Sequence, residues 1–260
     1  METAKNIYER ENQPTLDAEA ERLKALEFPV FVSEQLLGDI NGKTVLDIGA
    51  GTNTILQSWI SEKGGKYIAL DPVKQYAQEQ RAEGVFSVVG KGEDLPFQNS
   101  SVDVAHTRFV LMHLDAERRA GVIQEARRVS KERALFLEYD WNTIVGGEKI
   151  KRFVDFCAKI AGPLGINLFM GSSLENDIRH VIGENGKFQI QHFLREKGDY
   201  YAELIPFAVS VQKVVAYKNT ELLEEFNAIF ADLQEEAHKS VEDGQEQFFP
   251  VDIVAVEVRR

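Results

Sequence analysis

Residues 43–54 read KTVLDIGAGTNT, and this stretch decides the fold of the chain. It opens with a short apolar run, rich in β-branched residues, that is typical of a buried strand. Gly49 and Gly51 follow at once, and apolar residues then recur at helical spacing: Ile55, Leu56, Trp59 and Ile60. The stretch therefore predicts a strand, a glycine turn and a helix, a unit in which the backbone approaches a ligand closely and the helix N-terminus faces it.

Strand and helix patterns alternate in the sequence that follows this unit. Such alternation predicts an α/β fold with a doubly wound, mostly parallel sheet and helices on both faces. The predicted helices are 54–62, 73–82 and 115–129. The predicted strands are 44–48, 66–70, 85–89, 102–106 and 133–139, and two later strands at 188–196 and 248–258 make seven.

We expect a single domain of 260 residues with a cofactor-binding core at 43–141. Residues 1–40 are predicted to form an N-terminal helical segment. Helical insertions at 142–171 and 203–243 follow strands that should end near the ligand edge, so together they are expected to form a lid. Ser172, with Glu175 three residues on, has the pattern of a capping box and predicts a helix start. The many acids after residue 219 are interpreted as a solvated face.

Composition limits the possible partners and compartments. The net charge of -12 disfavours DNA, RNA and anionic membranes, because binding phosphates needs clustered Lys and Arg. No apolar run is long enough to span a bilayer, and no basic–apolar signal peptide opens the chain. The single cysteine, Cys157, fits a reducing cytosol, so we expect a cytoplasmic protein. The five histidines are scattered without the spacing of a zinc site, and no metal is expected.

Two acids favour one ligand class at the glycine turn. Asp47 would face a bound pyrophosphate of the same sign, and the turn G-A-G-T-N-T lacks the third glycine of a dinucleotide site. S-adenosylmethionine carries an ammonium and a sulfonium group, which remove this conflict. Asp71 ends the second strand, where an acid can accept hydrogen bonds from both ribose hydroxyls. Asp71 suits NAD equally well, so the choice of S-adenosylmethionine depends on Asp47 and the missing glycine.

Four stretches make residues 43–141 resemble a class I S-adenosylmethionine-dependent methyltransferase. The family subgroup is the one that acts on small molecules and includes quinone-biosynthesis and natural-product methyltransferases. VLDIGAGTN resembles the family's D-x-G-x-G-x-G turn, and YIALDP its ribose-binding acid. VVGKGEDLPFQNSSVDVA and RFVLMHLDAERRAGVIQEARRVSKERALFLEYDW resemble the segments that follow. After residue 141 the resemblance is only architectural.

The resemblance implies cofactor-binding roles for Asp47, Gly49, Gly51, Asp71, Pro72, Gly92, Glu93 and Thr107. Asp47 and the two glycines of the turn would surround the methionine half, with Thr107 close to it. Asp71 would bind the ribose, and the remaining residues would lie beside the adenine. Two positions depart from the family pattern: Asn53 replaces the third glycine, and Lys91 stands where the family often has Asp.

In methyl transfer the cofactor supplies the reactive group, because the sulfonium methyl is already electrophilic. The acceptor must approach in line with the S–CH3 bond, and a base is needed only if the acceptor must lose a proton. The candidate bases are His106, His113 and Asp140. Candidate substrate contacts are Tyr139, Trp141 and Phe169, and Arg108 is a candidate partner for a cofactor or substrate carboxylate.

The sequence therefore predicts methyl transfer from S-adenosylmethionine to a small, apolar or aromatic acceptor at an O, N, C or S atom. Two alternatives remain open at this stage. One is an NAD-dependent oxidoreductase, and the other is a non-catalytic S-adenosylmethionine-binding module whose lid recruits a partner protein. The acceptor and the oligomeric state are not determined by the sequence.

Overall fold

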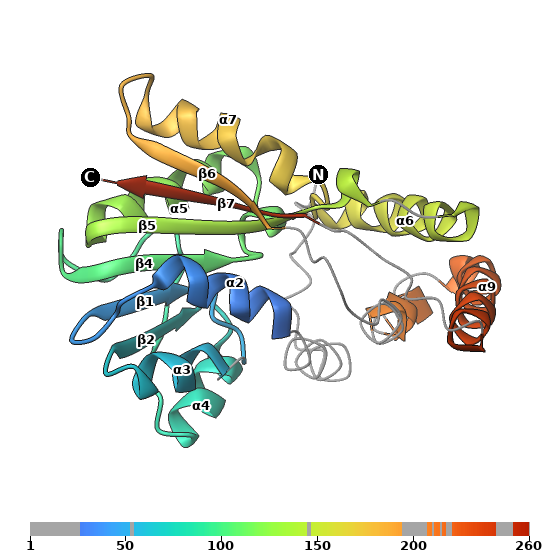
Figure 1. Ribbon diagram of the computed structural model, residues 1–260, viewed down its shortest axis with the longest axis horizontal. Coiled ribbons are helices and arrows are strands. Elements are labelled where there is room, and N and C mark those ends of the chain that lie inside the picture. The colour runs from blue at the N-terminus through green and yellow to red at the C-terminus, as the bar shows by residue number, and fades with distance from the viewer. Residues whose placement is uncertain are drawn as a thin grey trace.

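The computed structural model describes residues 27–52, 55–144, 147–193, 207–209, 211–213, 215–216, 220–242 and 252–259. The predicted helices before residue 27 lie outside this part of the chain, as do the outer ends of the last two predicted strands. At the centre is a seven-stranded sheet with the order β3-β2-β1-β4-β5-β7-β6 (Figure 1). Its strands are β1 Thr44–Ile48, β2 Lys66–Asp71, β3 Ser87–Val89, β4 Val102–Arg108, β5 Ser130–Asp140, β6 Phe188–Phe193 and β7 Asp252–Arg259.

The predicted α/β class and mostly parallel sheet are confirmed. Strands β1 to β5 pair in parallel, whereas β7 runs antiparallel to both β5 and β6. The described helices are α2 Glu27–Leu37, α3 Ile55–Glu62, α4 Lys74–Ala82, α5 Ala116–Val129, α6 Glu148–Ala161, α7 Met170–Ile182 and α9 Leu223–Glu242. The observed bounds of β1 to β5 lie within a few residues of the five strands predicted in the core.

Two apolar layers cover the two faces of the sheet. Helices α2 and α3 pack on one face, where Val45 of β1 is fully buried. Helices α5 and α7 pack on the other face, against the next residue of the strand, Leu46. This alternation is what a strand buried on both sides requires, because successive side chains point to opposite faces.

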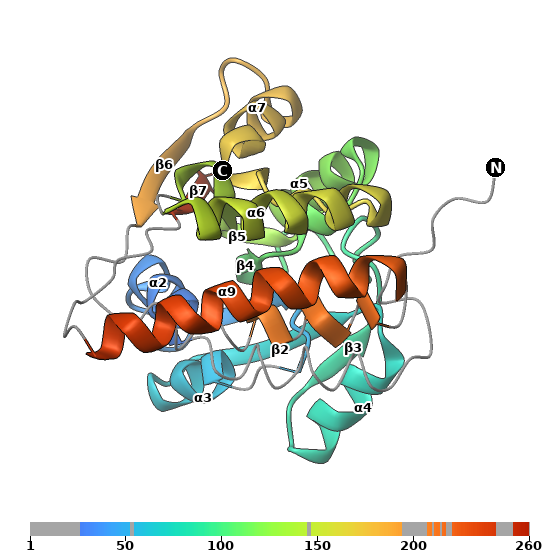
Figure 2. The same ribbon diagram turned by 90° about the vertical axis from the view of Figure 1, so that its right-hand side faces the viewer.

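Helices α6 and α9 lie beyond the carboxyl ends of the parallel strands (Figure 1), and Figure 2, which looks onto that edge, shows them crossing in front of it. They share an apolar cluster with the partly buried side chains of Met112 and Trp141. Three ion pairs also join them: Lys149–Glu235, Arg152–Asp232 and Lys159–Glu225. The acids of these pairs remain partly or largely exposed, so the interpretation of the acids after residue 219 as a solvated face holds for them, and α6 supplies basic partners to three of them.

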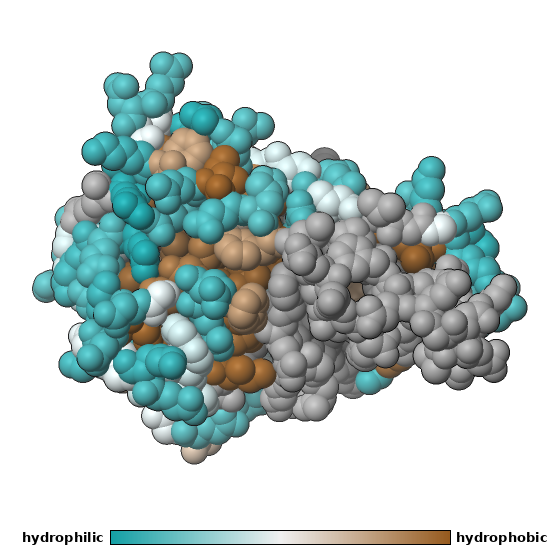
Figure 3. Space-filling view, viewed as in Figure 1, coloured by the Kyte–Doolittle hydropathy of each residue, from teal (hydrophilic) through white to brown (hydrophobic). Residues whose placement is uncertain are grey.

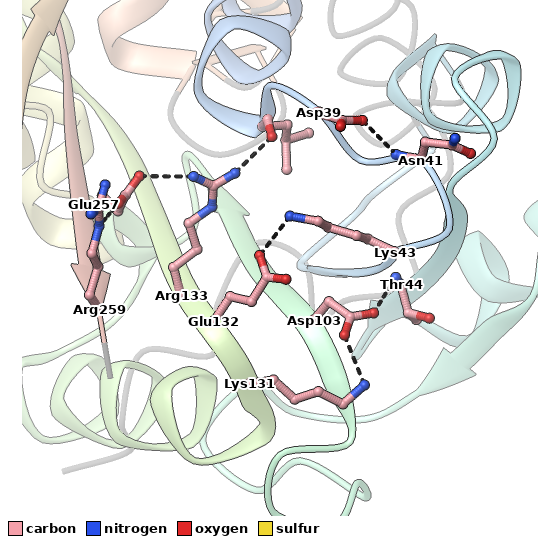
Figure 4. Close-up of polar contacts among 11 residues, drawn as sticks. Asp39, Asn41, Lys43, Thr44, Asp103, Lys131, Glu132, Arg133, Glu257 and Arg259 are labelled. Carbon is pink, nitrogen blue, oxygen red and sulfur yellow. Dashed lines mark hydrogen bonds and ion pairs between the residues drawn. The ribbon is translucent and has the colours of Figure 1, made fainter.

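The opposite edge of the sheet is closed by charged contacts (Figure 4). Asp103 accepts a hydrogen bond from the Thr44 amide at 2.7 Å and pairs with Lys131 at 2.8 Å. Arg133 donates to the Leu37 carbonyl at 2.7 Å and so ties β5 to the end of α2. This edge anchors strand ends, and in doubly wound sheets ligands bind beyond the opposite, carboxyl ends of the strands.

The capping box predicted at Ser172 is wrong. Helix α7 begins at Met170, and the Ser172 hydroxyl donates to Asp140 at 2.5 Å. Within the helix, Gly171 packs so closely on β5 that an added Cβ would lie 2.6 Å from the Cβ of Asp140. A tertiary contact with the strand has therefore replaced the local cap.

On the face shown in Figure 3, hydrophilic residues surround an apolar area beside α2. Phe31 of this helix is 50% exposed. None of the helices in the described ranges is long and apolar enough to cross a membrane.

Candidate active site

The glycine turn after β1 folds back onto the end of β2. Gly49 and Gly51 have φ values of 72° and 58°, which other residues adopt only under strain. The amides of Gly49 and Ala50 both donate to the Leu70 carbonyl, at 2.7 and 3.1 Å. The Gly51 amide donates to the Asp71 carboxylate at 2.9 Å. The N–H groups of three successive residues of the turn therefore already donate hydrogen bonds to the end of β2.

Gly49 also touches the loop that follows β4. A Cβ added at Gly49 would lie 2.5 Å from a methyl carbon of Val110. The turn after β1 and the loop after β4 are thus in direct contact, as expected where the strand order reverses in a doubly wound sheet.

Asp71 lies where the sequence predicts the ribose-binding acid. Its side chain is 5% exposed, and its other oxygen accepts the Val73 amide at 2.8 Å. Burial raises the pKa of Asp71 to about 6, although the hydrogen bonds from Val73 and Gly51 lower it. The carboxylate is charged at neutral pH and retains lone pairs for further donors.

Asp47 lies beneath the turn and is engaged within the protein. Its carboxylate accepts the Tyr67 hydroxyl at 2.8 Å and faces the Nδ1 atom of His106 at 2.7 Å. Burial by itself raises the pKa of Asp47, but the charge and hydrogen bond of His106 outweigh it and the pKa falls below its ordinary value. The predicted contact of Asp47 with the methionine half stays a prediction.

His106, a predicted candidate base, is engaged within the protein, and its role as a base stays a prediction. His106 is fully buried, and its Nε2 atom lies 3.0 Å from the hydroxyl of Ser33 on α2. That hydroxyl is also within hydrogen-bond distance of the Pro29 carbonyl, at 3.1 Å. Both ring nitrogens of His106 are therefore engaged within the protein, by Asp47 and by Ser33, and neither is free for a substrate.

We expect His106→Ala to lower the free energy of unfolding by about 3 kcal/mol, because it leaves the buried Asp47 without its main partner. Urea denaturation measures the change. His192→Ala is the matched control, since the His192 side chain is 62% exposed, and it should cost no more than about 0.5 kcal/mol. Equal stability of the two variants would contradict the assignment of His106 as the main partner of Asp47.

The residues predicted beside the adenine differ in their surroundings. Pro72 is exposed at the end of β2. Gly92 is packed against the core, where an added Cβ would lie 2.8 Å from Ile48. Glu93 pairs with Arg118 of α5 at 2.9 Å, so its carboxylate has a partner within the protein. Their contacts with adenine stay predictions.

The loop after β4 carries strain and buried polar atoms. Phe109 has φ 59° and stacks on Tyr139 with ring centroids 4.0 Å apart. Strained residues of this kind cluster at functional sites. The hydroxyl of Thr107 and the Nη1 atom of Arg108 are buried and have no hydrogen-bond partner within the described residues. The hydroxyl of Thr52, in the turn after β1, is likewise buried and has no hydrogen-bond partner within the described residues.

The end of β5 holds most of the predicted acceptor contacts. Asp140 accepts the Asn142 amide at 3.0 Å as well as the Ser172 hydroxyl, so both of its oxygens already support local structure. Trp141 lies edge-on to Phe207, with ring centroids 5.3 Å apart. Phe169 is half-buried at the start of α7. Their roles, and that of Asp140 as a base, stay predictions.

His113 ends the short helix η2, Leu111–His113, in the loop after β4. Its side chain is half-buried. Its role as a base stays a prediction.

Sequence reasoning assigns no role to Glu138 or Ser33. Glu138 has no local signal beyond its place near the end of a strand. Nothing local in the sequence links Ser33 to His106, 73 residues away. These partners are visible only after the helices are packed on the sheet.

The residues at this edge fit an adenosine-containing cofactor without phosphates. The turn provides a close backbone approach, Asp71 provides an acceptor for hydroxyls, and the hydroxyls of Thr52 and Thr107 are buried polar groups without partners within the described residues. Such groups are costly unless something satisfies them.

Comparison with known proteins gives one family match. Residues 46–137 match the family model described as a methyltransferase domain. This range runs from β1 into β5 and contains the turn, Asp71 and the loop after β4. A comparison with curated protein sequences gave no match.

Solved structures share the fold at low sequence identity. A putative methyltransferase from an antibiotic biosynthesis pathway of Anabaena variabilis is 16% identical with a TM-score of 0.65, over 90% of this chain and 99% of that one. The cyclopropane synthase MmaA2 of Mycobacterium tuberculosis is 16% identical with a TM-score of 0.56, over 89% and 82%. An N-methyltransferase of Haemonchus contortus, solved with phosphomonomethylethanolamine and S-adenosylhomocysteine, is 10% identical with a TM-score of 0.58, over 100% and 60%.

Proposed function

We propose that this chain, which carries a methyltransferase domain over residues 46–137, transfers a methyl group from S-adenosylmethionine to a small organic acceptor. The observation that carries the proposal is the use of the turn amides. Gly49, Ala50 and Gly51 donate their N–H groups to the end of β2. A dinucleotide site presents such amides to a pyrophosphate, whereas S-adenosylmethionine has no phosphate to bind.

The charge of Asp47 distinguishes the two cofactor classes less clearly than the sequence suggests. Both oxygens of Asp47 already have partners, His106 and Tyr67, so the carboxylate is engaged within the protein. The choice between the two cofactor classes therefore depends on the hydrogen bonds of the backbone.

The bound cofactor supplies the electrophilic methyl group. The protein's part is to hold the two reactants in line and to keep water out. Asp71 would accept the ribose hydroxyls, and the turn would support the rest of the cofactor. Trp141 and Phe207, at the apolar cluster of α6 and α9, suit an apolar or aromatic acceptor.

Arg108 has a place in this proposal. Its charge helps to lower the pKa of Asp47, yet the Asp47 oxygens are taken by His106 and Tyr67. A buried guanidinium nitrogen favours an anionic partner. Arg108 would therefore bind a carboxylate, either that of the cofactor or one on the acceptor.

Isothermal titration with S-adenosylhomocysteine and with NAD tests the cofactor. We expect S-adenosylhomocysteine to bind and NAD, at the same concentrations, to give no heat of binding. Tight binding of NAD without binding of S-adenosylhomocysteine would instead support the oxidoreductase alternative.

Transfer itself needs a second measurement. The protein is incubated with S-adenosylmethionine labelled in the methyl group and a panel of small aromatic and apolar acceptors with free O, N or S atoms. We expect label in at least one acceptor. Cofactor binding without any transfer across the panel would favour the non-catalytic module.

A further inference from the structure

Glu138, near the end of β5, is fully buried at the active-site edge. One oxygen of its carboxyl accepts the Leu111 amide at 2.6 Å. The amides of the neighbouring Val110 and Met112 also lower the pKa of this carboxyl, so the loop after β4 turns its backbone N–H groups towards a side chain from another strand. The second oxygen, Oε2, is buried and has no hydrogen-bond partner in the described chain.

The loop that Glu138 holds connects the parts of the active site. Val110 packs against Gly49 of the cofactor turn. Two residues later, the Met112 carbonyl accepts the Asn167 amide at 2.7 Å, and the Met112 side chain packs on the cluster of α6 and α9. Between them, the strained Phe109 begins the loop. A movement of this loop would therefore alter its contacts with both the glycine turn and the cluster of α6 and α9.

We infer that Glu138 is a positioning residue that fixes the loop of residues 109–113, and through it the spacing between the cofactor turn and the lid. It does not reach a ligand itself, because its side chain has no exposed surface. Its link to cofactor binding rests on the function proposed above.

Glu138 performs this task as a neutral acid. Burial raises its pKa to about 8, although the three loop amides and the charge of Arg119 lower it. Arg119, on α5, is itself paired with Asp177 of α7 at 2.6 Å. The other titratable neighbours are Asp140 on β5, engaged by Ser172, and His113 on the loop itself. A neutral carboxyl needs no counter-charge, and its carbonyl oxygen still accepts the amides.

Hydrogen exchange of the amides of residues 110–112 tests the inference without a ligand. We expect Glu138→Ala to speed their exchange about tenfold or more at pH 7, since each lost hydrogen bond is worth about 1 kcal/mol. Glu138→Gln should keep wild-type protection, because glutamine offers a carbonyl oxygen and no charge. As the pH rises from the ordinary value of 4.5 towards about 8, the wild type should lose part of its protection relative to the glutamine variant, because ionisation of the buried Glu138 favours opening; above pH 8 the difference should stay constant.

Glu257→Gln serves as the control, since Glu257 is a buried acid on β7 that pairs with Arg133 at the other edge. It should leave the exchange of residues 110–112 unchanged. Wild-type protection in Glu138→Ala, or a loss in Glu138→Gln at pH 7 as large as in Glu138→Ala, would overturn the inference. If Glu138→Ala fails to fold, the pH dependence of exchange in Glu138→Gln tests the inference instead.

Titration with S-adenosylhomocysteine separates the two proposals. We expect about tenfold weaker binding in Glu138→Ala and near wild-type binding in Glu138→Gln. If the wild type does not bind S-adenosylhomocysteine, the proposed function fails. The exchange experiment still tests whether Glu138 fixes the loop of residues 109–113. If the wild type binds and both variants bind equally well, the link between the loop and the cofactor is wrong.

Discussion

Gly49→Ala is expected to weaken binding of S-adenosylhomocysteine by at least about 100-fold while the protein stays folded. The new Cβ would lie 2.5 Å from Val110, about 1 Å closer than carbon atoms normally approach. The residue would also keep φ 72°, a left-handed conformation that costs about 1–2 kcal/mol without glycine. The turn and the loop after β4 must move apart, and this movement disrupts the geometry of the proposed cofactor site.

Gly38→Ala separates backbone strain from the collision. Gly38 has φ 57°, also left-handed, but an added Cβ there meets nothing within 4 Å. This control should lose about 1 kcal/mol of stability and no cofactor affinity. The double variant Gly49→Ala, Val110→Ala removes the colliding methyl groups and should recover much of the affinity. No loss of affinity in Gly49→Ala would mean that the cofactor does not bind at this turn.

Asp71→Asn should reduce the affinity for S-adenosylhomocysteine by about 100-fold or more, since two ribose hydroxyls lose bonds to a charged group, worth about 1.5–3 kcal/mol each. Isothermal titration measures the loss. Glu83→Ala, which removes an exposed acid just after α4, is the control. Unchanged affinity in Asp71→Asn would place the ribose elsewhere.

The stability of Asp71→Asn should change little at pH 7. The pKa of Asp71 is raised in the folded state, so its ionisation opposes folding. That penalty is absent below the unfolded-state pKa of 3.8, grows as the pH rises towards about 6, and then stays constant at about 3 kcal/mol. Asparagine removes the penalty and loses one accepted backbone hydrogen bond. Wild-type affinity should itself fall below pH 6 as Asp71 becomes protonated.

Much of the fold is readable from the sequence because it depends on local periodicity. Alternation and helical spacing place β1 to β5 and their helices within a few residues. The glycines of the turn are readable because their left-handed conformation is a local need. Ser172 is the counter-example, where a convincing local cap pattern lost to a contact with Asp140.

The sequence by itself determined the strand–turn–helix unit, the order of the elements and the presence of Asp71 at the carboxyl edge, since these depend on residues close together in the chain. Only the tertiary structure decided what the polar side chains bind. Asp47 meets His106 across 59 residues, and Glu138 meets Leu111 across 27. Hydrogen bonds require partners within about 3 Å, and that distance is set by strand register and helix packing, which no local pattern encodes.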